Sequence, residues 1–374
     1  MPNNFAYLML LIWPLISIAL YKKRSILEAT FGTIIGGLLL LPIGVQIDFP
    51  MLPAFDKNTI PAIMAFVGCR YVAKKRVSLL PPQGLERKLI IIFFIGCIAT
   101  VLTNGDPVEE TGRYIPGLTY RDVFSVVMAQ CLLVLPFSLA IQLIKTPEDQ
   151  IKIFKLLVAA GLIYSVLILF ELRMSPQLHR WVYGYFPYTW GQHVRHGGFR
   201  PVVFLGHGLW VSIFILTVLG AALTLMKLKI KMTKPRNGLV ILYLVGLLIL
   251  AKGFGATILG LVLLVGIVVL SSSIANKLAI AIAIVAITYP LLCVMDVFPH
   301  NYLVEIFDAI DPLQAGSLAF RFEQEASLLS RTMGKIIFGW GAWGRNRLPD
   351  SVVDGYWISL ISMYGAIGFT QYLG

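Results

Sequence analysis

Long apolar runs separated by short polar segments dominate this chain of 374 residues. An α-helix needs about 20 mostly apolar residues to cross the hydrocarbon core of a bilayer, and several runs approach that length. The pattern predicts an all-α fold, a polytopic transmembrane bundle of about eleven spans. The predicted spans are 5–21, 28–47, 59–73, 88–103, 121–144, 153–171, 201–226, 238–251, 256–271, 278–295 and 354–373.

The composition supports a membrane protein. Hydrophobic residues make up 57% of the chain and charged residues 13%, whereas a soluble domain is about 25% charged. We therefore expect a single integral membrane domain over 1–374, with no soluble module. The N-terminus lacks the basic region of a cleavable signal peptide, so we expect none.

The basic residues predict the topology. The net charge is +12, and much of it lies in short loops after alternate apolar runs, at 22–24, 74–76, 145–155 and 227–236. Such loops face the cytoplasm under the positive-inside rule. No arginine and lysine stripe with interleaved aromatics is evident, so we expect no nucleic-acid binding. The segments expected outside are the N-terminus, 48–58, 104–120, the loop 172–200 and the large loop 296–353.

The outer segments are rich in arginine but poor in lysine. The guanidinium group can grip a phosphate or carboxylate through two parallel hydrogen bonds, which an ammonium cannot do. We expect two or three of these arginines to bind phosphate and most to pair with outer acids, such as Asp106, Glu109, Glu110, Glu323 and Glu325. The four cysteines lie in or beside apolar runs without metal-ligand spacing, so we expect neither a metal nor another cofactor. The outer arginines are Arg113, Arg121, Arg173, Arg180, Arg195, Arg200, Arg321, Arg331, Arg345 and Arg347.

The loop 172–200 is dense in aromatic residues, which either anchor the protein at the membrane interface or stack on sugar rings. Arg200 directly precedes the run 201–226, and His207 would lie two turns deeper. Ionisable residues at that depth are candidates for a functional site. The alternatives are that Arg200 snorkels toward the headgroups and that His207 is a hydrogen-bonded packing residue.

The large loop 296–353 predicts an amphipathic helix from Ser317 to Ile337. Asp354 follows the loop, where the last apolar run begins. A carboxylate there can act as a base if burial raises its pKa, can be paired with an arginine, or can cap a helix. The expected apolar side carries Leu318, Phe322, Leu329 and Met333, and the polar face carries Arg321, Gln324, Glu325 and Arg331.

Four sequence features in this order resemble the O-antigen ligase and polymerase superfamily of membrane glycosyltransferases. Arg200 leads into a span, Lys252-Gly253-Phe254-Gly255-Ala256-Thr257 forms a short outer turn, and Arg321 precedes Ile337-Phe338-Gly339-Trp340-Gly341. The fourth feature is Asp354-Gly355, followed after nine residues by Gly365-Ala366-Ile367-Gly368. The resemblance covers about the second half of the chain, together with the layout of the spans in the first half.

The resemblance implies about a dozen helices in the bacterial inner membrane, with a large outer loop over a site on the periplasmic side. It implies transfer of a glycan from an undecaprenyl-diphosphate-linked oligosaccharide to an acceptor glycan hydroxyl, with inversion and without a metal. The partners implied are these two glycans, membrane lipids and other polysaccharide-assembly proteins. Because family members continue with another helix, we expect a twelfth span if the chain extends beyond Gly374.

Carried over to this sequence, Arg200 and Arg321 would bind the diphosphate and Asp354 would be the catalytic base. We expect supporting roles for Arg195, His207 and Lys252. Ligases typically have histidine and a small polar residue where this chain has Asp354-Gly355, which favours a polymerase of O-antigen or exopolysaccharide units over a ligase acting on lipid A-core. A lipid-linked glycan transporter (flippase) and a structural partner of a polysaccharide machine are the alternatives from other classes.

Overall fold

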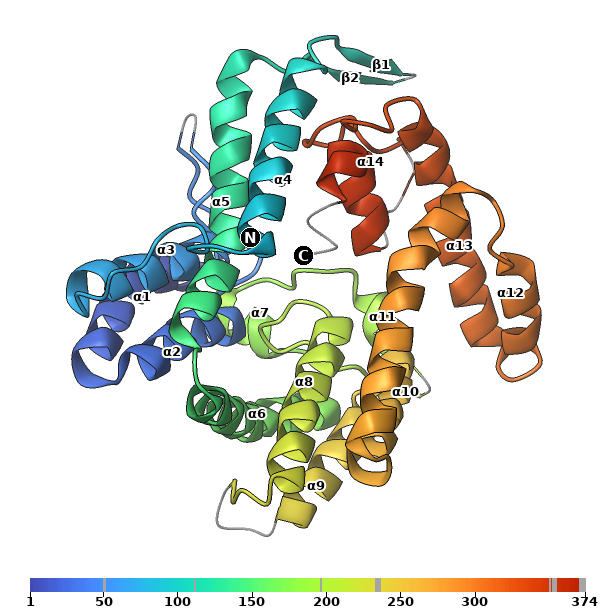
Figure 1. Cartoon of the computed structure of the whole chain (residues 1–374). Helices are drawn as coiled ribbons and strands as arrows, with labels where there is room; N and C mark the ends of the chain where they lie inside the picture. Colours follow the sequence, from blue (N-terminus) through green and yellow to red (C-terminus); the bar gives the residue numbers. More distant parts are fainter. Residues whose placement is uncertain are drawn as a thin grey trace. The chain divides into compact units, whose positions relative to one another are not determined.

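The computed structural model describes residues 1–49, 52–110, 112–195, 197–232, 237–349, 351 and 355–369. Within them the fold is all-α, apart from two small antiparallel hairpins (Figure 1). Each predicted apolar run contains a helix. These helices are α1 (Asn4–Lys23), α2 (Ile26–Leu40), α3 (Thr59–Val67) continued by the π-helix η1 (Gly68–Val72), α4 (Leu85–Leu102), α5 (Tyr120–Leu143), α6 (Pro147–Met174), α8 (Gly208–Lys227), α9 (Asn237–Leu250), α10 (Phe254–Leu264) continued by the π-helix η3 (Val265–Val269), α11 (Ser272–Val294) and α14 (Tyr356–Gly368).

Five of the described helices are long and apolar enough to cross a membrane: α1, α5, α6, α8 and α11. Helices α2, α9, α3 with η1 and α10 with η3 are apolar but shorter. The structure is thus that of an all-α protein with several candidate spans, and the number of eleven stays a prediction.

The remaining elements fall in the segments that the sequence predicts to lie outside. They are the hairpin of β1 (Val108–Glu110) and β2 (Arg113–Ile115), the helix α7 (Leu178–Tyr183), the 3₁₀ turn η2 (Trp190–His193), the hairpin of β3 (Val194–Arg195) and β4 (Gly198–Phe199), and the helices α12 (His300–Asp308) and α13 (Pro312–Met333).

Local sequence signals explain where several helices begin. Thr146 caps α6 by accepting from the backbone N–H of Asp149, while the Asp149 side chain accepts from the backbone N–H of Thr146. This reciprocal arrangement satisfies two amide groups that have no partner inside the helix. Pro147 occupies the first turn, where proline is favoured because no helical hydrogen bond is lost.

The helix in the predicted span 201–226 begins later than the apolar run does. Helix α8 starts at Gly208, and residues 201–207 form a loop in which Val203 and Gly206 have φ of +48° and +83°. Left-handed backbone interrupts a helix, and Pro201 cannot supply an amide hydrogen bond to one. His207 therefore caps α8, and the expectation that it lies two turns inside a helix is wrong.

The amphipathic helix of the large loop is shifted from its predicted position. Helix α13 covers Pro312–Met333, whereas the pattern predicted Ser317 to Ile337. Met333, expected on the apolar side, is exposed, and Glu325, expected on the polar face, is buried. Glu325 can be buried because its carboxylate accepts a hydrogen bond of 2.6 Å from the Tyr289 hydroxyl.

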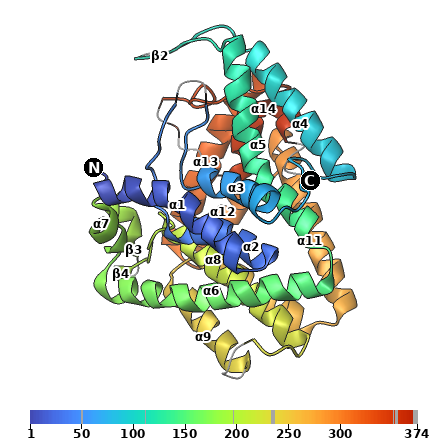
Figure 2. The same ribbon diagram turned by 90° about the vertical axis from the view of Figure 1, so that its left-hand side faces the viewer.

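The chain divides into two compact units, each with its own apolar clusters. In the first unit, α1, α2 and α3 pack together, and α6 runs beside α2 (Figure 2). Helix α8 contacts α6, α9 and α10 and supplies much of the buried apolar core. The first unit comprises 1–49, 54–79 and 132–278, and the second comprises 50–53, 80–131 and 279–374.

The second unit holds α14 between α4 and α13. Gly96 of α4 lies against Ile367 of α14 so closely that an added Cβ atom would be 2.5 Å from the Ile367 side chain. The two helices can approach only because residue 96 has no side chain.

Candidate functional site

A buried carboxylate holds the loop that carries Arg200, which we call the Arg200 loop (residues 200–207). Glu171, near the end of α6, is fully buried. One of its oxygens accepts from the backbone N–H groups of Val202 and Val203, both at 2.7 Å, and the other accepts from that of Leu178 at 3.0 Å. Three donors satisfy the buried carboxyl group and fix the loop relative to α6.

Two further side chains fasten the same loop at Phe204. The Tyr164 hydroxyl accepts from the Phe204 amide at 3.1 Å, and Lys57 Nζ donates to the Phe204 carbonyl at 2.6 Å. Burial lowers the pKa of Lys57 to about 7, although the nearby Asp56 carboxylate opposes that shift. The backbone of the Arg200 loop is thus held on both sides of Val203.

Arg200 is enclosed by protein at the start of α8. The residue is 7% exposed, and its amide donates to the His193 carbonyl at 2.8 Å. A Cβ atom added at Gly208 would lie 3.0 Å from the Cβ and 3.1 Å from the Nε of Arg200. The guanidinium stem therefore packs on the first residue of α8, whose helix dipole places partial positive charge at that end. Together these two features favour an anion.

His207 and His193 lie beside Arg200. His207 caps α8 by accepting from the Leu209 amide at 3.1 Å, and its ring centroid is 5.1 Å from that of His193. His193 is fully buried, and neither of its ring nitrogens has a hydrogen-bond partner among the residues that the structure describes. Burial lowers the pKa of His193 to about 4, and His207 and Arg200 add to that effect. The His193 ring is therefore neutral at physiological pH.

The short turn between α9 and α10 brings Lys252 to the same place. Lys252 has a left-handed φ of +54°, and its Nζ lies 2.5 Å from where a Cβ atom of Gly198 would be. A Cβ atom at Gly253 would lie 2.3 Å from Ser212 Oγ, so glycine lets this turn pack on α8. Arg200, His207 and Lys252 thus gather around β4 and the first turn of α8.

The two glycine motifs of the second unit contact each other through their backbones, an arrangement that we call the glycine contact. The Trp340 and Gly341 amides donate to the Ser362 and Met363 carbonyls, both at 2.9 Å, and the Ala366 amide donates to that of Ile336 at 2.7 Å. The contact interrupts α14 at Gly365, which has φ of +67° and ψ of −166°. Such a backbone conformation is essentially restricted to glycine.

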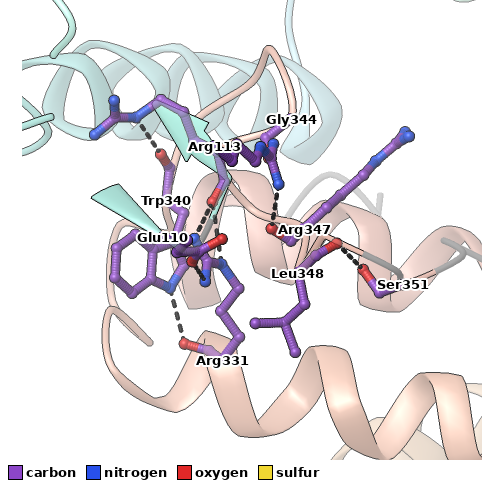
Figure 3. A network of polar contacts seen from close by, with 9 residues as sticks. Glu110, Arg113, Arg331, Trp340, Gly344, Arg347, Leu348 and Ser351 are labelled. Carbon is purple, nitrogen blue, oxygen red and sulfur yellow. Dashed lines mark hydrogen bonds and ion pairs between the residues drawn. The ribbon is translucent and has the colours of Figure 1, made fainter. Parts of the chain in front are cut away.

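Arginines also brace this part of the second unit (Figure 3). Arg331 forms an ion pair with Glu110, donates to the Arg345 carbonyl at 2.7 Å and lies 4.6 Å over the Trp340 ring. Arg345 is 1% exposed and donates to the carbonyls of Pro116, Asp106 and Trp340 at 2.6 to 3.2 Å. The expectation that outer arginines pair with outer acids is confirmed for Arg331, whereas Arg345 binds backbone carbonyl groups.

The remaining predicted site residues are Arg321, Asp354 and Arg195. Arg321 is exposed on α13 in the second unit, whereas Arg200 belongs to the first. Asp354 lies outside the described residues, as does the side chain of Arg195, whose backbone belongs to β3. The meeting of Arg200, Arg321 and Asp354 around one diphosphate stays a prediction.

Sequence reasoning left Glu171, His193 and Arg345 out of the candidate site. One signal was available for Glu171, because it is the acid that closes the long apolar run 153–171. An acid in that place needs a partner, which the Arg200 loop supplies. Arg345 had no comparable signal, since the other outer arginines are indistinguishable from it in sequence.

Among the described residues, no group of three or more histidine, cysteine, aspartate or glutamate side chains could hold a metal ion. No family model, curated protein or solved structure matches the chain.

Proposed function

We propose that the protein is a membrane glycosyltransferase of the O-antigen polymerase type. It would join undecaprenyl-diphosphate-linked oligosaccharide units to the hydroxyl of an acceptor glycan, at the periplasmic face of a bacterial inner membrane. The observation that carries the proposal is the enclosed Arg200 at the first turn of α8, on a loop held by the buried Glu171. A guanidinium group next to a helix N-terminus, on a loop whose backbone is held, suits a diphosphate.

The chemistry assigns a distinct task to each proposed residue. The bond between the donor sugar and the diphosphate breaks, and the acceptor oxygen forms the new glycosidic bond from the opposite face, which inverts the configuration. Arg200 and Arg321 stabilise the negative charge that grows on the leaving diphosphate. Asp354 takes the proton of the acceptor hydroxyl, and the lipid diphosphate leaves unprotonated.

The glycine contact supports the place assigned to Asp354. Residue 354 lies between Gly341 and Ser362 in the sequence, and backbone hydrogen bonds fasten the two ends of that segment at Trp340 to Ser362 and at Gly341 to Met363. A base must be held within hydrogen-bond reach of the hydroxyl that it deprotonates. The described residues on either side of position 354 are thus held together by these hydrogen bonds.

Aspartate at position 354 favours a polymerase over a ligase, because the ligase motif that this region resembles typically carries histidine there. A polymerase adds repeat units successively, so its products form a ladder. A ligase makes a single transfer, and a flippase makes none.

The test is a reconstituted assay with purified protein and an undecaprenyl-diphosphate-linked oligosaccharide. We expect laddered products from the natural protein. In Arg200→Lys or Arg321→Lys a compact ammonium group replaces the guanidinium group and cannot form its two parallel hydrogen bonds. We expect the rate of transfer to fall about a hundredfold, as it does when a hydrogen-bond donor to the transition state is lost. Arg180→Lys, in the same outer loop but exposed on α7, is the matched control and should retain activity. Normal ladders from both Arg200→Lys and Arg321→Lys would refute the diphosphate assignment.

A further inference from the structure

A groove lies between α12 and α13, wholly inside the second unit and outside the predicted spans. The two helices run side by side in Figure 1, and the groove has a volume of about 500 Å³. That volume falls within the range of small-molecule sites in proteins, roughly 300 to 1,000 Å³. Its lining includes His300 and Glu305 of α12 and Ala319, Phe322, Glu323 and Ala326 of α13.

Alanine residues and aromatic rings determine the shape of the groove. Ala319 and Ala326 lie about one helical turn before and after Phe322, so α13 leaves space toward α12 on both sides of the ring. The Phe322 ring centroid is 4.5 Å from that of His300, and Phe298 lies 4.9 Å from His300. The three rings contact one another, and those of Phe322 and His300 give the groove an apolar surface.

The rim of the groove is acidic. Glu305 and Glu323 come from opposite helices, and both are exposed. Burial lowers the pKa of His300, although the Asp296 carboxylate opposes that shift. The described lining contains no lysine or arginine. Carboxylates accept hydrogen bonds from hydroxyl and ammonium groups and repel phosphate and other carboxylates.

We infer that the α12–α13 groove binds a neutral or amino-sugar segment of a glycan chain. A sugar ring has an apolar C–H face, which can lie on Phe322, and an edge of hydroxyl groups, which can donate to Glu305 and Glu323. This inference rests on the proposed function, because it gives the glycan of that reaction a second place of contact. The groove suits the sugar part of the substrate and excludes the diphosphate, which the Arg200 loop is proposed to hold.

Binding can be measured on the full-length protein in detergent by titration calorimetry or saturation-transfer NMR. The probes are three tetrasaccharides: N-acetylglucosamine (neutral), glucosamine (amino) and galacturonic acid (acidic). We expect the first two to bind, and the acidic one to bind at least about tenfold more weakly because like charges repel.

Matched substitutions on α13 locate the binding. Ala326→Gln, which fills the groove, and Phe322→Ala, which removes the ring, should each weaken binding of the neutral and amino probes at least about tenfold. Ser330→Gln and Phe320→Ala change the same helix at exposed residues outside the groove and should bind as the natural protein does. Thermal unfolding of each variant identifies any that fail to fold.

Three outcomes would overturn the inference. One is that no tetrasaccharide binds at millimolar concentration, and another is that folded Ala326→Gln binds as tightly as the natural protein. The third is that tetralysine binds more tightly than the sugars, which would indicate a basic peptide as the occupant. Arg200→Lys separates the two proposals, because it should lose transfer and keep tetrasaccharide binding. If the natural protein transfers no glycan yet binds the probes through the groove, only the proposed function fails.

Discussion

Two buried ionisable side chains of the first unit have identifiable hydrogen-bond partners. Glu171 accepts from three amides, and Lys57 donates to the Phe204 carbonyl. A buried polar group without a partner costs free energy, so each pairing restricts where its backbone can lie. At the scale of residues, these polar contacts hold the Arg200 loop together with its buried apolar side chains at 202–205.

The carboxylate of Glu171 should be essential to that restraint. Glu171→Gln leaves one acceptor oxygen and places an NH₂ group opposite an amide, so we expect a loss of about 1 to 3 kcal/mol for each amide left without an acceptor. Thermal unfolding in detergent measures it. Glu148→Gln, exposed on the first turn of the same helix, should unfold as the natural protein does. A Gln variant as stable as the Glu148 control would contradict the role.

The buried His193 should make the protein less stable in mild acid. Its pKa is about 4 in the native state and 6.5 without perturbation, so between those values the unfolded chain binds a proton that the native chain does not. Stability therefore falls as pH drops from 6.5 to 4, by an amount on the order of 3 kcal/mol for this group.

The His193→Phe variant keeps an aromatic ring but cannot titrate, so its stability should depend less on pH within that window. Unfolding midpoints between pH 4 and 7.5 test this. Lys57 does not interfere, because its native pKa of about 7 and its ordinary value of 10.5 confine its contribution to higher pH. His179, also buried with a pKa of about 4, leaves a residual slope in the variant. An unchanged slope would show that His193 does not titrate as described.

At the scale of elements, a helix break and a glycine turn join two motifs that lie about 25 residues apart in the chain. Helix α14 opens at Gly365 so that its backbone can meet residues 336–341. Glycine is needed on both sides, since Gly339 also has a positive φ and lies against the backbone of Met363 and Gly365. The break in α14 thus allows a tertiary backbone contact.

Replacing Gly365 by alanine should damage this contact. The new Cβ atom would lie 2.2 Å from the Ile337 carbonyl oxygen, in a conformation that itself costs about 1 to 3 kcal/mol for a residue with a side chain. We expect a lower unfolding midpoint and loss of glycan transfer. Gly246→Ala in α9 is the control, because its Cβ atom would meet nothing within 4 Å and alanine favours a helix. If both alanine variants unfold alike, the glycine contact contributes nothing to stability.

At the scale of the whole molecule, the proposed site depends on the membrane orientation that the charge pattern predicts. The Arg200 loop, the glycine contact and the α12–α13 groove all lie in or next to segments expected outside, whereas the lysine-rich loops are expected in the cytoplasm. A lipid-linked glycan reaches an outer site only if that orientation is correct.

Labelling of single introduced cysteines in intact cells tests the orientation. A membrane-impermeant maleimide should react with Ser330→Cys on the exposed side of α13, and with Lys75→Cys only after the membrane is permeabilised. The natural protein, in which three of the four cysteines are buried, gives the background. The reverse labelling pattern would place the proposed site in the cytoplasm and exclude a periplasmic reaction.

The sequence by itself determined the all-α class and the approximate place of every described apolar helix, because the length and polarity of a run are local properties that a bilayer selects directly. It also predicted that outer arginines pair with outer acids, which Arg331 confirms. Tertiary structure alone decided that Arg331 meets Glu110, 221 residues away, that Arg345 is buried while Arg321 is exposed, and that α8 begins at Gly208. Those outcomes depend on which distant backbone groups come within hydrogen-bond distance, and no local pattern encodes that.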